Sequence, residues 1–321
     1  RELLRSCVTT KQIDKAVYEF ILSQGAKPTF LGYGGFPAST CISVNEVIIH
    51  GIPGNRVLKE GDIVSVDVGA TWGGFTGDCA ATFACGAISP TAQKLITVTE
   101  QSFYEGIKFA RQGNRISDIG HAVQTYVESH GFGVVRAFVG HGVGEKMHEE
   151  PEVPNFGSPG RGPRMVKGMT LAIEPMVTQG TYDVRVLKDG WTTVTADGKL
   201  AAHYENSILI TDGEPEILPS LRDCKLWKLT NRAWSSQKPG GIRASCSTWS
   251  TRMSSMSISL TARAASWRSQ SAKSASILNR YLGRSHESPR KFATARRYSI
   301  ANYEKNWPAS AKNKVKTKGV N

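Results

Sequence analysis

The first 220 residues predict an α+β fold, because strand-like and helix-like patterns follow one another along them. Apolar, partly alternating runs typical of strands lie near residues 41–49 and 62–84. Segments with helical spacing of apolar residues lie at 10–24, 90–112 and 117–131. Since 220 residues are enough for one sizeable core, we expect a single domain over residues 1–220.

The first and last turns of these helices carry recognisable signals. Thr9-Thr10-Lys11-Gln12 has the form of a capping box, and Gly25 is suited to end the helix that it starts. The second helix should run from about Pro90 to Gln112. The third should start at Ser117 and end at Gly131.

The segment 62–84 reads as a β-hairpin with an acidic residue in each strand. Asp67 ends the run that starts at Ile63, Asp78 follows eleven residues later, and Gly73-Gly74 between them indicates a turn. A turn centred on Trp72-Gly73 would place Asp67 directly opposite Asp78. Like charges across a strand pair are destabilising, so a divalent cation between them is the simplest explanation.

Three further residues fit the same interpretation. His141 lies in a glycine-rich segment, Glu174 follows the apolar run 169–173, and Glu205 precedes the apolar run 208–210. Taken singly, such residues are more often turn, cap or core residues. Together, four carboxylates and one imidazole form an oxygen-rich set that favours Mn, Fe or Co and suits two ions with bridging carboxylates.

Several motifs occur in a specific order around these residues. They are Cys41-Ile42-Ser43-Val44-Asn45-Glu46, His50-Gly51-Ile52-Pro53, His141-Gly142-Val143-Gly144, His148-Glu149-Glu150-Pro151, Ile173-Glu174-Pro175 and His203-Tyr204-Glu205-Asn206. With them, residues 8–218 closely resemble the type I methionine aminopeptidases. The resemblance implies the pita-bread fold, a pseudo-two-fold mixed β-sheet with helix pairs packed on one side.

The resemblance also implies a role for each motif residue. Asp78 and Glu205 would bridge two divalent ions (Co, Mn, Fe or Zn), Asp67 would complete one metal site, and His141 with Glu174 the other. Glu174 would relay a proton, while His50 and His148 would contact the substrate around the scissile amide. The implied reaction is two-metal hydrolysis that removes N-terminal Met when the second residue is small.

A pocket for the methionine side chain is implied as well. The residues at the corresponding positions are Phe30, Tyr33, Phe36, Cys41, Met147 and Trp191. Aromatic edges and sulfur suit a thioether, although any one of these residues could equally be an ordinary core residue. Phe36 and Met147 depart from the tyrosine and the aromatic residue expected there, and both keep the pocket apolar. We expect Glu149 and Glu150 to lie in a solvated loop, and Cys79 to point away from Asp78.

Two other functions remain open at this point. A proline-specific aminopeptidase of the same fold would share the metal ligands, but the His50-Gly51-Ile52-Pro53 motif and the single-domain body favour methionine release. A non-catalytic binding module of the same fold is the second alternative. The expected partners are nascent polypeptide N-termini and the ribosome, and we expect a monomer. The cysteines form no CxxC pair and no apolar run reaches eighteen residues, which favours the cytoplasm and no membrane.

The charge of the chain is unevenly distributed. Residues 221–321 hold 21 Lys and Arg against 3 Asp and Glu, a formal charge of +18, which leaves −5 for residues 1–220. This segment is serine-rich and contains five tryptophans. It could be a basic arm that contacts RNA, a plain solvated tail, or the product of a frameshift or read-through. We favour the last hypothesis because evolved disordered tails are poor in aromatic residues.

The chain opens at Arg1 in a helix-like stretch. The resemblance implies further helical sequence before this point, so we expect an opening segment to be missing and the domain to be less stable without it.

Overall fold

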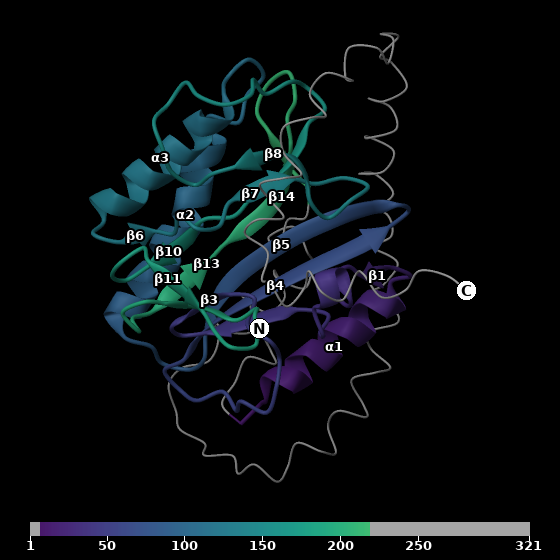
Figure 1. Cartoon of the computed structure of the whole chain (residues 1–321), viewed down its shortest axis with the longest axis vertical. Coiled ribbons are helices and arrows are strands. Elements are labelled where there is room, and N and C mark those ends of the chain that lie inside the picture. Colours follow the sequence, from purple (N-terminus) through teal and green to yellow (C-terminus); the bar gives the residue numbers. More distant parts are fainter. Residues whose placement is uncertain (1–6, 219–321) are drawn as a thin grey trace, which may run out of the picture.

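The structure, a computed structural model, describes residues 7–218 (Figure 1). The predictions for the basic segment 221–321 and for the chain start therefore lie outside the described residues. Nine strands form the main sheet, in the order β1-β4-β5-β14-β9-β7-β8, with β2 paired to β4 and β15 paired to β14. Every strand pairing among residues 7–218 is antiparallel.

The main sheet is built from long central strands and short outer ones. Its strands are β1 (Lys27–Pro28), β2 (Cys41–Val44), β4 (Ile63–Trp72), β5 (Phe75–Ala84), β7 (Gly140–Gly142), β8 (Glu149–Val153), β9 (Thr170–Ile173), β14 (Glu205–Leu209) and β15 (Glu216–Ile217). Two three-stranded sheets complete the described domain. They contain β13 (Ala201–His203), β10 (Met176–Thr178) and β6 (Gly133–Val134), and β11 (Val184–Val186), β12 (Thr193–Thr195) and β3 (Val47–Ile49).

The helices begin close to where the sequence predicts them. Helix α1 (Thr10–Ser23) starts with the expected capping box between Thr9 and Gln12. Helix α3 (Ile116–Ser129) agrees with the predicted segment within two residues. Helix α2 (Pro90–Ile107) ends five residues earlier than predicted, because Ala110 turns into the core and the Asn114 side chain donates to the carbonyl of Phe109. A short 3₁₀ helix, η1 (Tyr33–Gly35), lies beside the site described below.

The hairpin register corrects one prediction. Asp67 pairs with Ala80, and Asp78 pairs with Gly69, so the two aspartates are not directly opposite. The turn consists of Gly73 and Gly74, whose φ angles of 60° and 88° suit a two-residue hairpin loop, rather than Trp72 and Gly73. The error is a shift of two residues, and side chains alternate with a period of two. Both aspartates therefore still lie on the same face of the sheet.

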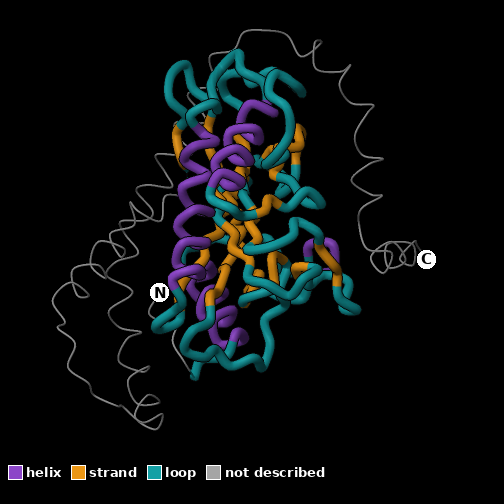
Figure 2. The backbone as a smooth tube through the Cα atoms, turned by 90° about the vertical axis from the view of Figure 1, so that its left-hand side faces the viewer, coloured by secondary structure: helices purple, strands orange, loops and turns teal. Residues whose placement is uncertain are grey.

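The two faces of the main sheet have different environments. The helices cover one face, where α2 and α3 lie side by side (Figure 2). Phe103 of α2 and Ile119 of α3 share a fully buried core with Leu171, Ile173 and Ile208 of the sheet. Helix α1 packs on the same face through Ile13, against Ile42 and Val64. The residues that alternate with these strand positions point to the opposite face.

The fold agrees with the predicted α+β class, and α2 with α3 forms one of the expected helix pairs. Glu149 and Glu150 belong to strand β8 and not to a loop, although their side chains are exposed as expected. Gly142 pairs with Glu149, which extends the sheet through this segment. Among residues 7–218, no helix has both the length and the apolar character needed to span a membrane.

Candidate metal centre

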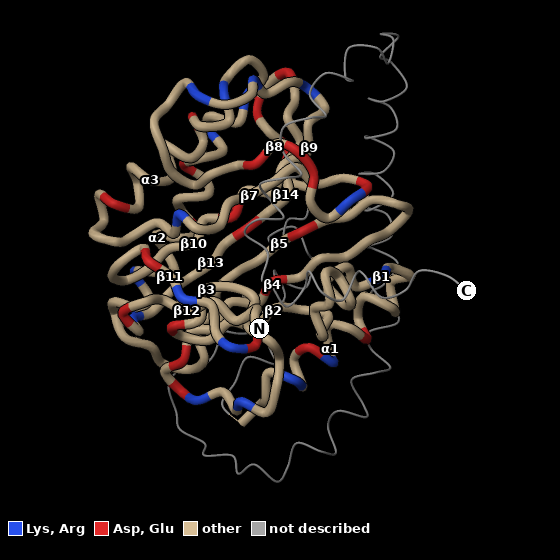
Figure 3. Tube along the Cα trace, viewed as in Figure 1, with Lys and Arg blue, Asp and Glu red and all other residues tan. Residues whose placement is uncertain are grey.

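Five adjacent strands each place one predicted ligand in the same region of the sheet. In sheet order, β4, β5, β14, β9 and β7 bring Asp67, Asp78, Glu205, Glu174 and His141, with Glu174 directly after the end of β9. These positions are spread over 139 positions of sequence, yet they lie on neighbouring strands. In Figure 3 acidic positions interrupt the otherwise uncharged middle of the sheet.

The register explains why these side chains meet on one face. Asp67 and Glu205 both pair with Ala80, so the three residues form one cross-strand row, and the small Ala80 leaves room between the carboxylates. His141 pairs with Ala172, two residues before Glu174 on β9. Because side chains alternate along a strand, all of these residues share the face opposite the helices. We call it the site face.

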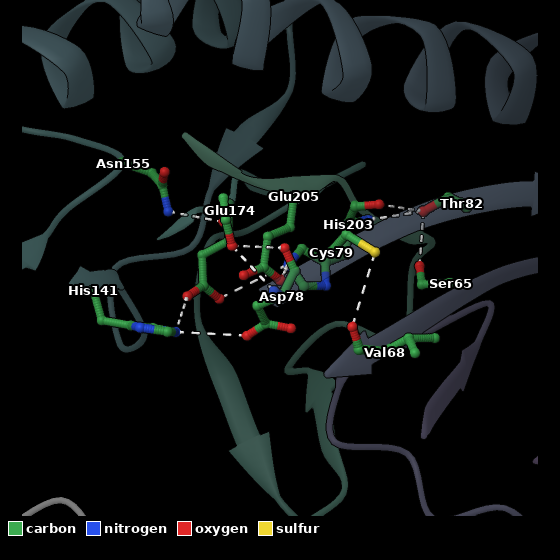
Figure 4. Close-up of polar contacts among 11 residues, drawn as sticks. Ser65, Val68, Asp78, Cys79, Thr82, His141, Asn155, Glu174, His203 and Glu205 are labelled. Atoms are coloured by element: carbon green, nitrogen blue, oxygen red, sulfur yellow. Dashed lines mark hydrogen bonds and ion pairs between the residues drawn. The ribbon is translucent and has the colours of Figure 1, made fainter. Parts of the chain in front are cut away.

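The distances define a compact cluster (Figure 4). His141 Nε2 lies 3.8 Å from Asp78 Oδ2 and 3.7 Å from Glu174 Oε1. A second imidazole, that of His203, lies 3.8 Å from Glu174 Oε2 and 3.7 Å from Glu205 Oε2. Each of these four N···O separations is longer than a hydrogen bond, so the imidazoles and carboxylates do not hydrogen-bond to one another.

Buried polar atoms in this cluster have no protein partner. They include Asp67 Oδ1, Asp78 Oδ1, Glu205 Oε1 and His203 Nε2, and only two other such side-chain atoms occur among residues 7–218. Leaving one such group unsatisfied costs about 1–3 kcal/mol, and more when it is charged. Two overlapping triplets, Asp67-His203-Glu205 and Asp78-His141-Glu205, have ligand atoms within 4.8 Å of one another. The donor set therefore fits divalent cations.

The pKa shifts of the carboxylates also indicate that the cluster is suited to bind cations. Burial, followed by the charges of the neighbouring carboxylates, raises the pKa values of Asp67, Glu174 and Glu205 well above their usual range. Burial raises the pKa of Asp78 to about 7. Four carboxylates at this spacing hold their charges at neutral pH only when cations compensate them.

Backbone contacts fix the orientation of two predicted ligands. His141 Nδ1 lies 2.8 Å from the carbonyl oxygen of Gly142, which leaves Nε2 directed toward Asp78 and Glu174. The Asn155 side chain donates to the carbonyl oxygen of Glu174 at 2.9 Å. Both contacts hold the ligand atoms in place before any ion binds.

The two other predicted histidines flank the cluster. The His148 ring packs against the His141 ring with centroids 4.3 Å apart, and its Nδ1 lies 2.7 Å from the Tyr33 hydroxyl. Burial is the main cause that lowers the pKa of His148 to about 3. His50 contacts the rings of Phe138 and Trp191, and burial lowers its pKa to about 4. Both imidazoles are therefore neutral at physiological pH.

The residues predicted to line the methionine pocket form a continuous apolar cluster beside the carboxylates. Its buried residues are Phe30, Phe36, Ala38, Cys41 and Met147, with Ile52 and Trp191 packed against them. Tyr33 lies at the exposed edge, where it reaches His148. Cys41 pairs with Asp67 across β2 and β4, so the apolar cluster and the carboxylates share a boundary. Gly69 lacks a side chain where the Phe30 ring lies against β4, since an added Cβ would come within 2.4 Å of it.

Two features of the site were not predicted from the sequence. One is the contact between Tyr33 and His148, and the other is the place of His203 among the carboxylates. His203 precedes Glu205 by two residues, which is the spacing of residues on one face of a strand. That spacing is the available signal, but a break between β13 and β14 separates the two residues. Cys79 points toward the carbonyl of Val68, 3.8 Å away.

An antiparallel sheet with helices on one face and a buried carboxylate–imidazole cluster on the other is an arrangement that suits a metal-dependent hydrolase. The sequence model of metallopeptidase family M24 matches residues 1–212, and the chain belongs to that family. It is 56% identical over 222 residues to a methionine aminopeptidase of Clostridium perfringens, covering 69% of this chain and 89% of the relative. It is 53% identical over 211 residues to methionine aminopeptidase 1 of Bacillus subtilis, covering 66% and 85%.

Solved structures of aminopeptidases are also similar to this chain. A methionine aminopeptidase from Thermotoga maritima superposes with a TM-score of 0.66 at 46% identity, covering 67% of this chain and 87% of that one. An X-Pro aminopeptidase from the same organism gives a TM-score of 0.52 at 18% identity, with 68% and 55% covered. The second likeness extends to the fold alone.

Proposed function

We propose that this chain is a methionine aminopeptidase, which removes the N-terminal methionine of new proteins when the second residue is small. The observation that carries the proposal is the shared boundary between the apolar pocket and the carboxylates at Cys41 and Asp67. A pocket of aromatic and sulfur-containing side chains suits a thioether, and it ends beside groups that attract the α-amino end of a peptide. The relatives described above support the same activity.

Asp67, Asp78, His141, Glu174 and Glu205 would hold two divalent ions, and the resemblance implies that Asp78 and Glu205 would contribute to both metal sites. When bound, such ions polarise a carbonyl group and lower the pKa of water. Mn, Fe, Co and Zn all accept this ligand set, so cellular availability selects among them.

Side chains of the protein would carry out proton transfer, stabilise the oxyanion and bind the substrate backbone. The Glu174 carboxylate lies within the cluster, 3.7 Å from His141 Nε2, where it can take up a proton and return it to the leaving amine. His148 is neutral and its ring lies against His141, so an N–H of its imidazole can donate to the developing oxyanion. His50, between Phe138 and Trp191 at the pocket edge, can bind the backbone beyond the cleaved bond.

The chemistry also suggests where the chain acts. A substrate that is an unblocked N-terminal methionine points to nascent polypeptides in the cytoplasm, with the ribosome as the place of encounter and a monomer as the working form. Cosedimentation of the full chain with ribosomes that carry a nascent Met-Ala sequence tests this part. Absence of cosedimentation at low salt would exclude a stable ribosome complex.

Peptide cleavage by the full chain tests the activity. The protein would be loaded with Mn(II) or Co(II) and given Met-Ala-Ser, Met-Leu-Ser and Ala-Pro-Ser. We expect release of methionine from Met-Ala-Ser alone, and its loss on addition of a chelator or in Asp78→Asn. Asp212→Asn, which changes an exposed carboxylate, is the matched control and should keep full activity.

The alternatives predict different results. Cleavage of Ala-Pro-Ser would assign the chain to the proline-specific aminopeptidases. If the folded protein binds both ions and cleaves none of the peptides, the chain is a non-catalytic binding module of the same fold.

A further inference from the structure

We propose that His203 is an additional metal ligand, which completes the half of the centre that contains Asp67. The inference deepens the proposed function, since it rests on the same metal centre. It concerns a residue outside the ligand set that the resemblance implies.

His203 occupies a position equivalent to that of His141. The Nε2 atom of His141 lies 3.7 and 3.8 Å from carboxylate oxygens of Glu174 and Asp78. The Nε2 atom of His203 lies 3.7 and 3.8 Å from carboxylate oxygens of Glu205 and Glu174. Glu174 thus has an imidazole beside each of its two oxygens. The cluster thus contains two imidazoles, one beside Asp78 and one beside Glu205 (Figure 4).

These separations suit ligands of a shared ion better than hydrogen bonds. An N–H···O hydrogen bond spans about 2.7–3.2 Å, which is shorter than all four distances. Two donor atoms that are each about 2.1 Å from one ion lie about 3.0 Å apart at a right angle and about 4.2 Å apart when opposite. The distances around His203 fall within that interval, and His203, Asp67 and Glu205 form one of the two compact triplets.

The buried imidazole nitrogen has no other partner. His203 is 2% exposed, and Nε2 makes no hydrogen bond to the protein. Asp67 Oδ1 and Glu205 Oε1, which belong to the same triplet, are also without partners. A cation that these three atoms share would satisfy all of them at once.

The backbone of His203 is held in place by side chains of the site face. The Thr82 hydroxyl accepts from His203 N at 2.9 Å and lies 2.9 Å from His203 O, to which it donates. The Ser65 hydroxyl contacts Thr82 at 2.7 Å and joins β4 to this arrangement. The chain between β13 and β14 is therefore fixed where the ring faces Glu174 and Glu205.

The added nitrogen changes the character of the site. With carboxylates alone, the Asp67 half is a hard oxygen site of the kind that suits Mn(II). An imidazole raises its affinity for Fe(II), Co(II) and Zn(II), which accept nitrogen ligands more readily than Mn(II) does. We therefore expect the two halves to differ less in metal preference than the five-residue set alone would predict.

X-ray absorption on the full chain loaded with two equivalents of Co(II) tests the proposal directly. We expect about one imidazole per cobalt in the unmodified protein and about half of that in His203→Gln. Calorimetry should show that His203→Gln binds the second Co(II) about 10–100-fold more weakly, the effect of losing a metal-site contact. His121→Gln, an exposed histidine on α3, is the matched control and should match the unmodified protein.

The outcomes separate the two proposals. About half an imidazole per cobalt in the unmodified protein overturns the assignment of His203, whether or not any variant folds. So does a His203→Gln protein whose two Co(II) affinities stay within about twofold of the unmodified values. Failure of the unmodified, cobalt-loaded protein to release methionine from Met-Ala-Ser would instead overturn the proposed function and leave the ligand count standing.

Discussion

The two faces of the main sheet use the same strands for opposite purposes. On β9, Leu171 and Ile173 are fully buried in the core beneath the helices, whereas Ala172 and Glu174 lie on the site face. The helix face stabilises the domain by removing apolar surface from water. The site face gathers buried carboxylates that repel one another and lack partners. Burial of apolar surface on the helix face therefore offsets the charge repulsion on the site face, which is unfavourable without cations.

Asp78→Asn should produce the largest loss of function. We expect peptide cleavage to fall by a factor on the order of 10³ or more, because the change removes a carboxylate between both halves of the centre. The metal-free protein should gain stability by about 1 kcal/mol at pH 8, since one of the repelling charges is lost. Methionine release and urea unfolding of the metal-free protein measure the two effects. A loss of stability would contradict the idea that the site face is unfavourable without cations.

Leu171→Ala should have the reverse effect. Leu171 is fully buried on the helix face, three residues from Glu174 on the same strand segment. We expect the protein to lose about 2–5 kcal/mol of unfolding free energy because a cavity replaces the side chain. Cleavage per folded, metal-loaded molecule should stay within about twofold, because the side chain points away from the site. A large loss of kcat in the folded variant would show that the two faces are not separable.

The metal-free protein should become less stable as the pH rises above about 6.5. The raised pKa values mean that the folded state holds protons on Asp67, Asp78, Glu174 and Glu205 that the unfolded state has released. Unfolding free energy then falls by about 1.4 kcal/mol per pH unit for each such proton. The contribution of Asp78 ends near its pKa of about 7, whereas those of the other three carboxylates continue to higher pH.

Below pH 6.5 the histidines act in the opposite direction. His50, His148 and His203 have pKa values lowered to about 4, 3 and 3, so they favour the unfolded state as the pH falls. Thermal unfolding from pH 6.5 to 8, with and without Mn(II), isolates the carboxylates. We expect Mn(II) to raise Tm more at pH 8 than at pH 6.5, and an equal rise at both would contradict the assignment.

Much of this arrangement follows from local sequence rules. The alternation around Asp67 and Asp78 predicted a hairpin with both residues on one face, and this prediction is correct even though the pairing is shifted by two residues. The capping box at Thr9 fixed the start of α1 to the residue. The joining of five distant strands is not a local property, and the resemblance supplied it where periodicity could not.

The structural features that could not be predicted from the sequence depend on tertiary contacts. The end of α2 is determined by the burial of Ala110, whereas the glycine that follows the predicted end of the helix is Gly113. His203 reaches the site through a break between two short strands that a period-two pattern does not span. The Tyr33 contact depends on a glycine-rich turn that brings residues 115 positions apart together.

Tyr33→Phe should have the smallest effect of these changes. It specifically tests the contact between the Tyr33 hydroxyl and His148, where the apolar cluster meets the metal centre. Burial raises the pKa of Tyr33, so the hydroxyl stays protonated and can donate to His148 Nδ1, which places the ring proton on Nε2. Tyr33 is therefore a positioning residue that selects the tautomer able to donate to an oxyanion. We expect kcat to fall about tenfold with KM within about twofold, because the contact matters most in the transition state.

Tyr126→Phe on α3 is the control. Nitrogen-15 shifts of His148 should show the Nε2–H form in the unmodified protein and a mixture in the variant. A raised KM with unchanged kcat would place Tyr33 in substrate binding alone.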